Sequence, residues 1–417
     1  MKYFINLSLL KRNRNFCFLY LGQFVSFIGA MITVVALPYQ IYHMTHSTLM
    51  IGLLSLFQLL PLLVTALIGG VFADRYHRRM LLLCAEILLA VGCLLLAMNS
   101  AYTPRILFIF IIAIIMSAIT GLHRPALDSI VQQIVKKEDY PEVGALATLK
   151  FSVGMIAGPA IGGILIASVG LTATYIVDFA TFAFSLLSLL LMTHIPKPLA
   201  GKDESTWSSL KSGFKYATSR QELMGTYFVD FVAMIFGMPM ALFPAIAASY
   251  GGAKTLGLLY SAPAVGALFI SVFSGWTKHV KRQGLAVAIS AVFWGIAIVF
   301  FGLASNLWVA LFFLALAGGF DSISGIFRSI MWNELIPNDF RGRLAGIEMI
   351  SYLSGPKLGD TESGLIASAF GITFSIVSGG ILCVVGVGFL CMFLPKFLSY
   401  RPNNDFLESS LTVEMER

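Results

Sequence analysis

Apolar runs of about 20 residues recur from one end of the chain to the other, and such a run is long enough to cross a bilayer as a helix. Hydrophobic residues make up 58% of the 417 residues and charged residues only 12%, whereas soluble domains carry about 25% charged residues. A transmembrane barrel is excluded, because its strands alternate in hydropathy over about 10 residues and these runs do not alternate. We therefore expect an all-α integral membrane protein.

The remaining composition excludes other classes of protein. The net charge of +7 comes from basic residues scattered over short loops, so the single basic patch of a nucleic-acid-binding protein is missing. The five cysteines lie in apolar segments, their number is odd and no CxxC pair occurs, which argues against a disulfide framework and a zinc site. No phosphate-binding loop, metal cluster or catalytic triad stands out. We expect neither an enzyme nor a metal or other cofactor.

Hydropathy over a window of about 19 residues predicts twelve membrane spans. The first six spans cover 16–41, 49–73, 80–99, 105–130, 142–168 and 171–193. The second six cover 223–248, 255–277, 285–304, 307–333, 342–366 and 371–394. The expected organisation is a six-helix bundle over 1–194, a polar cytoplasmic linker over 195–221, a second six-helix bundle over 222–395 and a cytoplasmic tail over 396–417.

Basic residues predict the orientation in the membrane, because cytoplasmic loops carry an excess of lysine and arginine. One side of the membrane carries, besides the linker, Lys11, Arg12, Arg14, Arg75, Arg78, Arg79, Lys136, Lys137, Lys278, Lys281, Arg282, Arg341 and Arg343. The loops on the other side carry only Arg105 and Lys254. Both termini and the linker are therefore expected in the cytoplasm.

The two halves of the chain resemble each other. Arg124 in the fourth span matches Arg328 in the tenth, 204 residues later. The pair Gly158-Pro159 in the fifth span matches Gly355-Pro356 in the eleventh. Two parallel six-helix repeats with a substrate site between them are the arrangement of major facilitator transporters.

Two motifs carry the resemblance to the major facilitator superfamily. Gly70, Asp74, Arg75, Arg78 and Arg79 are spaced as in the superfamily's loop between spans 2 and 3, although His77 stands where a glycine is usual. The second motif resembles the antiporter motif of proton-driven exporters and consists of Gly154, Gly158, Pro159, Gly162 and Gly163. The resemblance implies two pseudo-symmetric six-helix halves and export by exchange with protons.

A narrower resemblance points to the bacterial enterobactin exporter family. It rests on Asn6-Leu-Ser-Leu-Leu-Lys11, on Met44-Thr-His-Ser-Thr48 and on residues 69–76, while His123-Arg-Pro-Ala-Leu127 resembles the related macrolide-efflux pumps. This resemblance implies a monomeric inner-membrane antiporter that moves a siderophore from cytoplasm to periplasm by alternating access. A multidrug or macrolide-type efflux pump, an importer of a ferric siderophore or another nutrient, and a non-transporting scaffold remain as alternatives.

Each motif also has a physical reading. Asp74 at a helix end can cap a neighbouring helix, and Arg75, Arg78 and Arg79 can pair with acids on spans 4 or 11 as a conformational latch. The alternative is that these arginines only set topology. The small residues around Pro159 give span 5 a smooth face on which another helix can pack closely, either as a seal between the halves or as ordinary packing.

Ionisable side chains at membrane depth are costly and therefore mark functional candidates. Asp321 lies near the midplane of span 10, and Arg328 follows seven residues later on the same face. Asp321 is the first candidate for proton coupling, with a fixed ion pair as the alternative. Span 11 carries Glu348, Lys357 and Asp360 and is interpreted as a cavity wall.

Further intramembrane charges extend this set. Asp128, Asp178, Asp230 and Asp360 are the other candidates for proton coupling. Arg124, Lys150, Arg328 and Lys357 suit an anionic cargo, because guanidinium and ammonium groups bind carboxylates, unless the acids neutralise them. The candidates for cargo binding are completed by Glu348, Tyr39 and Phe231. Glu86 in the third span is expected to be structural, because that helix is usually peripheral in this fold.

Overall fold

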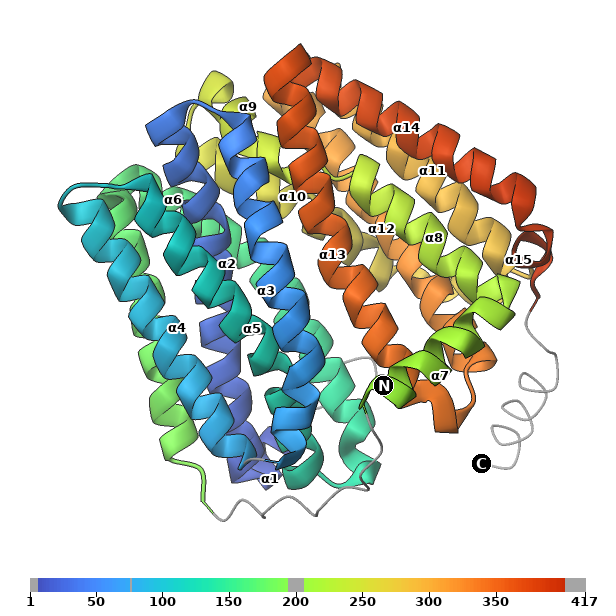
Figure 1. Ribbon diagram of the computed structural model, residues 1–417, viewed down its shortest axis with the longest axis horizontal. Coiled ribbons are helices and arrows are strands. Elements are labelled where there is room, and N and C mark those ends of the chain that lie inside the picture. Colours follow the sequence, from blue (N-terminus) through green and yellow to red (C-terminus); the bar gives the residue numbers. More distant parts are fainter. Residues whose placement is uncertain (1–6, 76, 194–205, 402–417) are drawn as a thin grey trace.

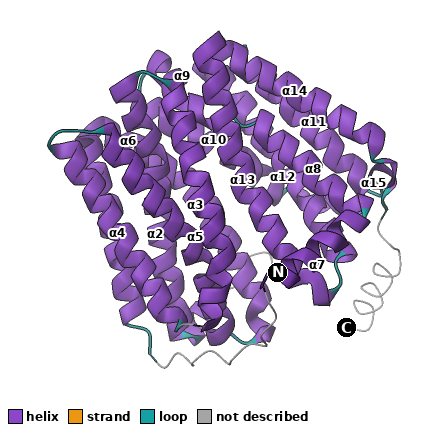
Figure 2. Cartoon of the chain, viewed as in Figure 1, coloured by secondary structure: helices purple, strands orange, loops and turns teal. Residues whose placement is uncertain are grey.

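The structure is a computed structural model that describes residues 7–75, 77–193 and 206–401. Within these ranges, the side chains of 70–75, 206–210, 338–339, 341–343 and 345–347 are outside the description. Every regular element in the described ranges is helical, and Figure 2 shows no strand among them. The expectation of an all-α membrane protein is confirmed.

The α-helices follow one another with short connections. Their bounds are α1 Ser8–Arg12, α2 Arg14–Thr45, α3 Thr48–Arg75, α4 Arg78–Ala101, α5 Ile106–Ile134, α6 Tyr140–Leu190, α7 Thr206–Ser219, α8 Gln221–Phe236, α9 Phe243–Tyr250, α10 Ala253–Val272, α11 Gln283–Gly302, α12 Leu307–Leu335, α13 Asn338–Phe370, α14 Ile372–Phe393 and α15 Pro395–Ser399. Three short 3₁₀ helices are η1 Lys137–Asp139, η2 Met240–Leu242 and η3 Ser274–His279.

Ten helices in the described part of the chain are long and apolar enough to cross a membrane. Two features separate this number from the twelve predicted spans. The fifth and sixth spans fall in α6, whose backbone leaves helical geometry at Gly170. The eleventh span falls in α13, which carries Lys357, Asp360 and Glu362 and is not among the ten.

Left-handed backbone marks the turns at one end of the molecule. Gly170 (φ 82°, ψ 174°) and Gly371 (φ 92°, ψ 160°) have nearly the same geometry, which only glycine adopts readily, and they lie 201 residues apart. The other turns with positive φ lie at His46, Gly251 and Gly252. We call this end of the molecule the glycine end, and the end with α1 and α7 the linker end.

The helices form two groups that lean on each other at the glycine end (Figure 1). The N-terminal group comprises α2–α6, and the C-terminal group comprises α8–α14. Between the groups, α3 packs on α13 and α6 packs on α10. Toward the linker end the two groups diverge (Figure 1).

Two glycine crossings bring the groups into close contact. A Cβ on Gly163 would lie 2.6 Å from Ala253 O and 2.9 Å from Gly257 Cα. A Cβ on Gly364 would lie 2.7 Å from Thr48 O and 3.0 Å from Gly52 Cα. Because neither position leaves room for a side chain, backbone meets backbone where α6 crosses α10 and where α13 crosses α3.

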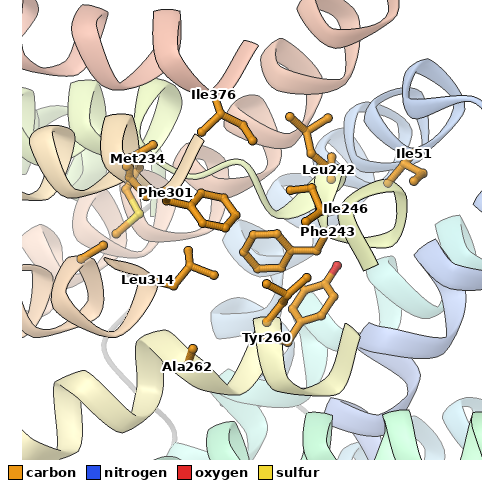
Figure 3. Packing of buried hydrophobic residues seen from close by; sticks show 14 of the residues in the cluster. Ile51, Met234, Leu242, Phe243, Ile246, Tyr260, Ala262, Phe301, Leu314 and Ile376 are labelled. Atoms are coloured by element: carbon orange, nitrogen blue, oxygen red, sulfur yellow. The ribbon is translucent and has the colours of Figure 1, made fainter. Parts of the chain in front are cut away.

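The largest apolar cluster also joins the groups near this end. The Phe243 ring packs edge-on against the rings of Tyr260 at 5.0 Å and Phe301 at 6.0 Å between centroids. Figure 3 shows these rings with Ile246 and Leu242 beside them and Ile51 of α3 on the far side of the cluster. The short segment η2–α9 thus anchors the C-terminal group.

The short helix α15 closes the C-terminal group at the linker end of α8 and α11. Phe397 is fully buried and packs against Gly225 of α8 and Gly284 of α11. The Tyr400 hydroxyl donates a 2.7 Å hydrogen bond to Glu334 Oε2. Burial and the adjacent carboxylate raise the pKa of Tyr400, so its hydroxyl keeps the proton of this bond at pH values where an ordinary tyrosine ionises.

Candidate functional site

A cavity of about 730 Å³ lies between the two groups. Its wall comes mainly from α2, α3, α5 and α6, and the C-terminal group adds Met240, Ala241, Tyr260, Lys357 and Asp360. Ligand pockets for drug-sized molecules measure about 300–1,000 Å³. Six of the sequence-predicted site residues line this cavity: Arg124, Asp128, Lys150, Asp178, Lys357 and Asp360.

Arg124, Asp128 and Lys150 form a charged cluster on the N-terminal wall. The Arg124 guanidinium lies 5.9 Å from the ring centroid of Tyr352, on α13 of the other group, in a cation–π contact. The Lys150 ammonium lies 5.8 Å from the Phe27 ring centroid. Asp128 interacts electrostatically with both cations. The cluster therefore carries one formal positive charge in excess.

Lys357 and Asp360 on α13 form hydrogen bonds with side chains of α3 in the other helix group. Lys357 Nζ donates a 2.6 Å hydrogen bond to Gln58 Oε1, and Ser55 Oγ donates a 2.9 Å bond to Asp360 Oδ2. Both partners lie on α3. Although Lys357 and Asp360 are three residues apart on one helix, the described residues show no ion pair between them. These polar contacts link α13 to α3.

Asp178 lies at a fully buried position where three helices meet. Its carboxylate accepts hydrogen bonds from Thr33 on α2, from the Cys93 thiol on α4 at 3.2 Å and from Thr181 at 3.1 Å. Gly29 of α2 packs directly against the Asp178 and Thr181 side chains. Neutral donors therefore satisfy this carboxylate, a pattern that keeps a buried acid in place without a cation.

A second charged cluster lies inside the C-terminal group. Arg328 forms an ion pair with Asp230 of α8, and its Nη2 lies 3.7 Å from Asp321 Oδ1. Glu348 interacts electrostatically with Arg328 and with Arg124. Asp321 lines a separate pocket of about 50 Å³ rather than the large cavity. The closer partner of Arg328 is thus Asp230, which the sequence pattern had not singled out as its partner.

The remaining predicted residues lie elsewhere. Tyr39 stacks on His43 at 5.9 Å, and neither Tyr39 nor Phe231 belongs to the wall of either cavity. Among the latch residues, Gly70, Asp74 and Arg75 lie in α3, and the side chains of Asp74 and Arg75 are outside the described set. Arg78 and Arg79 donate to backbone carbonyls at the linker ends of α5 and α6: Ser129 O at 3.1 Å, and Leu189 O at 2.9 Å with Leu190 O at 3.0 Å.

The antiporter-type motif faces two different helices. Gly154, Gly158 and Gly162 pack against Phe27, Met31 and Ile32 of α2, inside the N-terminal group. Of the four glycines in the motif, only Gly163 faces α10 of the other group. Close by, Ser261 Oγ on α10 donates a 2.8 Å hydrogen bond to Ile156 O on α6. Pro159 is buried and contributes its carbonyl oxygen to the contact with Gly257.

Several polar residues of the site were missed because they carry no formal charge. Gln58 and Ser55 lie in an apolar run and hold Lys357 and Asp360. Gln23 and His123 contact Glu86, which is fully buried. An uncharged polar residue inside a predicted span is the signal that identifies such positions, because burial of an amide in an apolar environment requires a partner.

Relatives with assigned names match almost the whole chain. An enterobactin exporter, EntS, of Salmonella choleraesuis is 29% identical over 406 residues, which is 96% of this chain and 98% of the relative. The EntS protein of Citrobacter koseri is 30% identical over 386 residues, covering 92% of each chain.

Solved structures of transporters share the fold. A POT family transporter in complex with 5-aminolevulinic acid matches with a TM-score of 0.75 at 14% identity, covering 92% of this chain and 97% of that one. The nucleoside transporter NupG matches with a TM-score of 0.70 at 14% identity, covering 92% of this chain and 99% of that one. The sequence model described as transmembrane secretion effector matches residues 8–417. The chain therefore belongs to the transmembrane secretion effector family of the major facilitator superfamily, a family of membrane transporters and not of enzymes.

Proposed function

We propose that the protein is a proton-coupled antiporter that exports a siderophore from the cytoplasm to the periplasm by alternating access. The observation that carries the proposal is the cavity of about 730 Å³ between the two helix groups, with three lysine or arginine and three aspartate side chains on its wall. Charges at membrane depth are retained where they serve a cargo or ion pathway. The enterobactin exporters that match over nearly the full chain support the siderophore as cargo.

In this proposal the chain crosses the inner membrane twelve times. Dividing α6 at Gly170 gives two spans, and α13 gives the eleventh, which adds two to the ten apolar helices. The bundles cover 1–194 and 222–395, the linker 195–221 and the tail 396–417. The excess of basic residues on the linker side supports a cytoplasmic position for both termini. One chain encloses the whole cavity, which supports a monomer.

In this proposal, the observed conformation is the one that gives access from the cytoplasm. The glycine crossings and the apolar cluster join the groups at the glycine end, which becomes the periplasmic end in this orientation. Opening toward the periplasm requires α6 to part from α10 and α13 from α3. Gly70, Asp74, Arg75, Arg78 and Arg79 would then latch the linker end closed.

The residue roles follow from position. Arg124, Lys150 and Lys357 bind the anionic part of the cargo, with Glu348 positioning Arg124 and Arg328. Asp128, Asp178 and Asp360 line the cavity and are the candidates for carrying the coupled proton there, and Asp321 and Asp230 share Arg328. Tyr39 and Phe231 would meet cargo only in another conformation.

Charge balance limits how far the cations alone define the cargo. With His123 counted as neutral, the formal charges of the wall cancel: Arg124, Lys150 and Lys357 against Asp128, Asp178 and Asp360. The local excess at Arg124 and Lys150 is the part that favours an anionic group. A siderophore with both hydroxyl donors and anionic oxygens can interact with the acidic and with the basic side chains of the wall.

Multidrug efflux is the second candidate function. Most of the cavity wall is apolar, with Phe27, Phe151, Phe182, Met31 and Met116 among its residues. Apolar and methionine-rich walls accept amphiphiles of several shapes. Competition between a catecholate siderophore and a cationic amphiphile for binding to the purified protein separates the two candidates. Only a multidrug efflux pump requires high affinity for the cationic amphiphile.

Transport into proteoliposomes tests the proposal. With an iron-free catecholate siderophore outside and an acidic lumen, we expect uptake several-fold faster than without a gradient, because protons leave as cargo enters. Arg124→Gln should slow uptake, whereas the matched variant Arg105→Gln, at an exposed loop position, should not. Uptake that is independent of the gradient contradicts antiport, and uptake driven only by an acidic exterior indicates an importer.

A further inference from the structure

Glu86 and His123 form a pair in the N-terminal group that none of the roles above uses. Glu86 on α4 is fully buried, while the His123 side chain on α5 is 17% exposed and lines the large cavity. His123 Nε2 lies 2.9 Å from Glu86 Oε1. The carboxyl group is therefore sealed among the helices, and the imidazole ring stands between it and the cavity.

One further side chain, Gln23, holds the carboxyl group and is itself held by Ser185. Gln23 Nε2 on α2 donates a 2.6 Å hydrogen bond to the same Oε1 and lies 3.2 Å from Ser185 Oγ on α6. Glu86 Oε2 is buried and has no hydrogen-bond partner among the described residues. A buried carboxylate with one unpaired oxygen is costly, and a proton on either member of the pair reduces that cost by neutralising the acid or forming an ion pair.

We propose that Glu86 and His123 form a proton-binding site that exchanges with the cavity through the imidazole ring. A proton from cavity water joins the neutral ring beside the Glu86 carboxylate and gives an imidazolium–carboxylate pair; release returns the same proton to water, and no other bond changes. Histidine suits this exchange because it changes charge between about pH 5 and 8. The inference rests on the proposed proton coupling.

Charged and titratable neighbours face this pair from each helix around it. From α6, Lys150 and Asp178 interact electrostatically with Glu86, and from α5 Asp128 interacts with His123 and with Arg124. On α4, the Cys93 thiol bonds to Asp178. The described parts of α2 and α3 present uncharged polar groups, including Gln23 and Gln58. Two cations and two carboxylates thus surround the pair, so its proton occupancy depends on which of them a cargo engages.

The test compares two modes of transport by the full-length protein in proteoliposomes. Counterflow exchanges labelled for unlabelled cargo without net proton movement, whereas gradient-driven uptake requires it. We expect His123→Gln and Glu86→Gln to keep counterflow within about twofold and to lose gradient-driven uptake at least tenfold. The matched variant His279→Gln, at an exposed position in η3, should keep both. Retained gradient-driven uptake overturns the proposal, as does an equal loss of counterflow, which indicates a structural role.

A spectroscopic measurement tests proton binding without any transport. Infrared difference spectra of the detergent-purified protein between about pH 5 and 8 should contain imidazole and carboxyl bands. His123→Gln and Glu86→Gln should each remove part of this signal, and His279→Gln should leave the bands of the pair in place. Unchanged spectra in both variants overturn the proposal. If the wild type shows no response to a gradient, the proposed antiport fails, and these spectra alone still decide whether the pair binds a proton.

Discussion

Alanine at Gly163 should push the protein toward the conformation that is open at the glycine end. The added methyl group would lie 2.6 Å from Ala253 O and 2.9 Å from Gly257 Cα, and both are backbone atoms that cannot rotate away. Helix α10 must therefore move away from α6 by several tenths of an ångström. Overpacking of this kind costs about 1–3 kcal/mol.

The cost applies mainly to the closed crossing, because a conformation in which α6 and α10 have parted accommodates the methyl group. A penalty of about 1–3 kcal/mol on one of two states shifts their ratio by about 5- to 150-fold. Gly364→Ala should act in the same direction, since its methyl group would lie 2.7 Å from Thr48 O and 3.0 Å from Gly52 Cα. Gly144→Ala and Gly388→Ala are matched controls, because no atom within 4 Å meets the added methyl group at either position.

Alkylation of a cysteine placed at Thr48 reports the opening. Thr48 is 8% exposed and donates a 3.2 Å hydrogen bond to Gly364 O, so Thr48→Cys is shielded while the crossing is closed. A membrane-impermeant maleimide applied from outside whole cells should react about 5- to 150-fold faster with Thr48→Cys in the Gly163→Ala background. The same backgrounds without Thr48→Cys give the reaction of the native cysteines. Equal rates in the Gly163→Ala and Gly388→Ala backgrounds would refute the reasoning that these crossings hold the end closed.

Three further predictions concern stability and cargo. Arg328→Met leaves the largely buried Asp230 without its cation and should cost about 3–5 kcal/mol in the free energy of unfolding in mixed micelles; the double variant with Asp230→Asn should recover part of it, and a loss below about 1 kcal/mol would contradict a buried ion pair. Phe397→Ala empties the space between Gly225 and Gly284 and should cost about 3–5 kcal/mol by the same assay, whereas Phe393→Ala, 63% exposed, should cost little; equal losses would show that α15 does not anchor the group. Lys357→Gln should weaken binding of an anionic siderophore at least fivefold in a fluorescence-quenching titration while sparing a neutral amphiphile, and equal weakening of both would assign Lys357 to the α3–α13 contact instead.

The family and the helical membrane class could be predicted from the sequence, because both depend on local patterns. Apolar run length identifies spans without knowledge of their packing, and the glycine motif of span 5 is contiguous in the chain. The eleventh predicted span, 342–366, falls in α13, which packs along α3 but is not among the ten apolar helices, because Lys357, Asp360 and Glu362 lower its mean hydropathy. The same charges are the reason for interpreting it as a cavity wall.

Partner choice could not be predicted, because it depends on side chains that meet across helices. The seven-residue spacing between Asp321 and Arg328 correctly predicts one face, yet the closer acid is Asp230, 98 residues away on α8. The three-residue spacing between Lys357 and Asp360 permits a pair, yet both turn to uncharged residues of α3. Sequence spacing constrains contacts within a helix and leaves contacts between helices open.

The repeat-related arginines Arg124 and Arg328 have different surroundings in the two halves, and this difference predicts different roles. Arg124 and Arg328 occupy matching positions, so the repeat alone predicts matching roles. Their neighbours differ: Arg328 is 8% exposed and tied to Asp230 and Asp321, whereas Arg124 lines the cavity and rests on Tyr352 of the opposite group. A cation already paired with two acids has little capacity left for an anionic cargo, while one held by an aromatic ring keeps its donors available. Of the two arginines, Arg124 should therefore bind the charge of the cargo, and Arg328→Gln should alter stability more than cargo affinity, with Arg124→Gln showing the reverse. Equal loss of cargo affinity in both variants would restore the symmetric assignment.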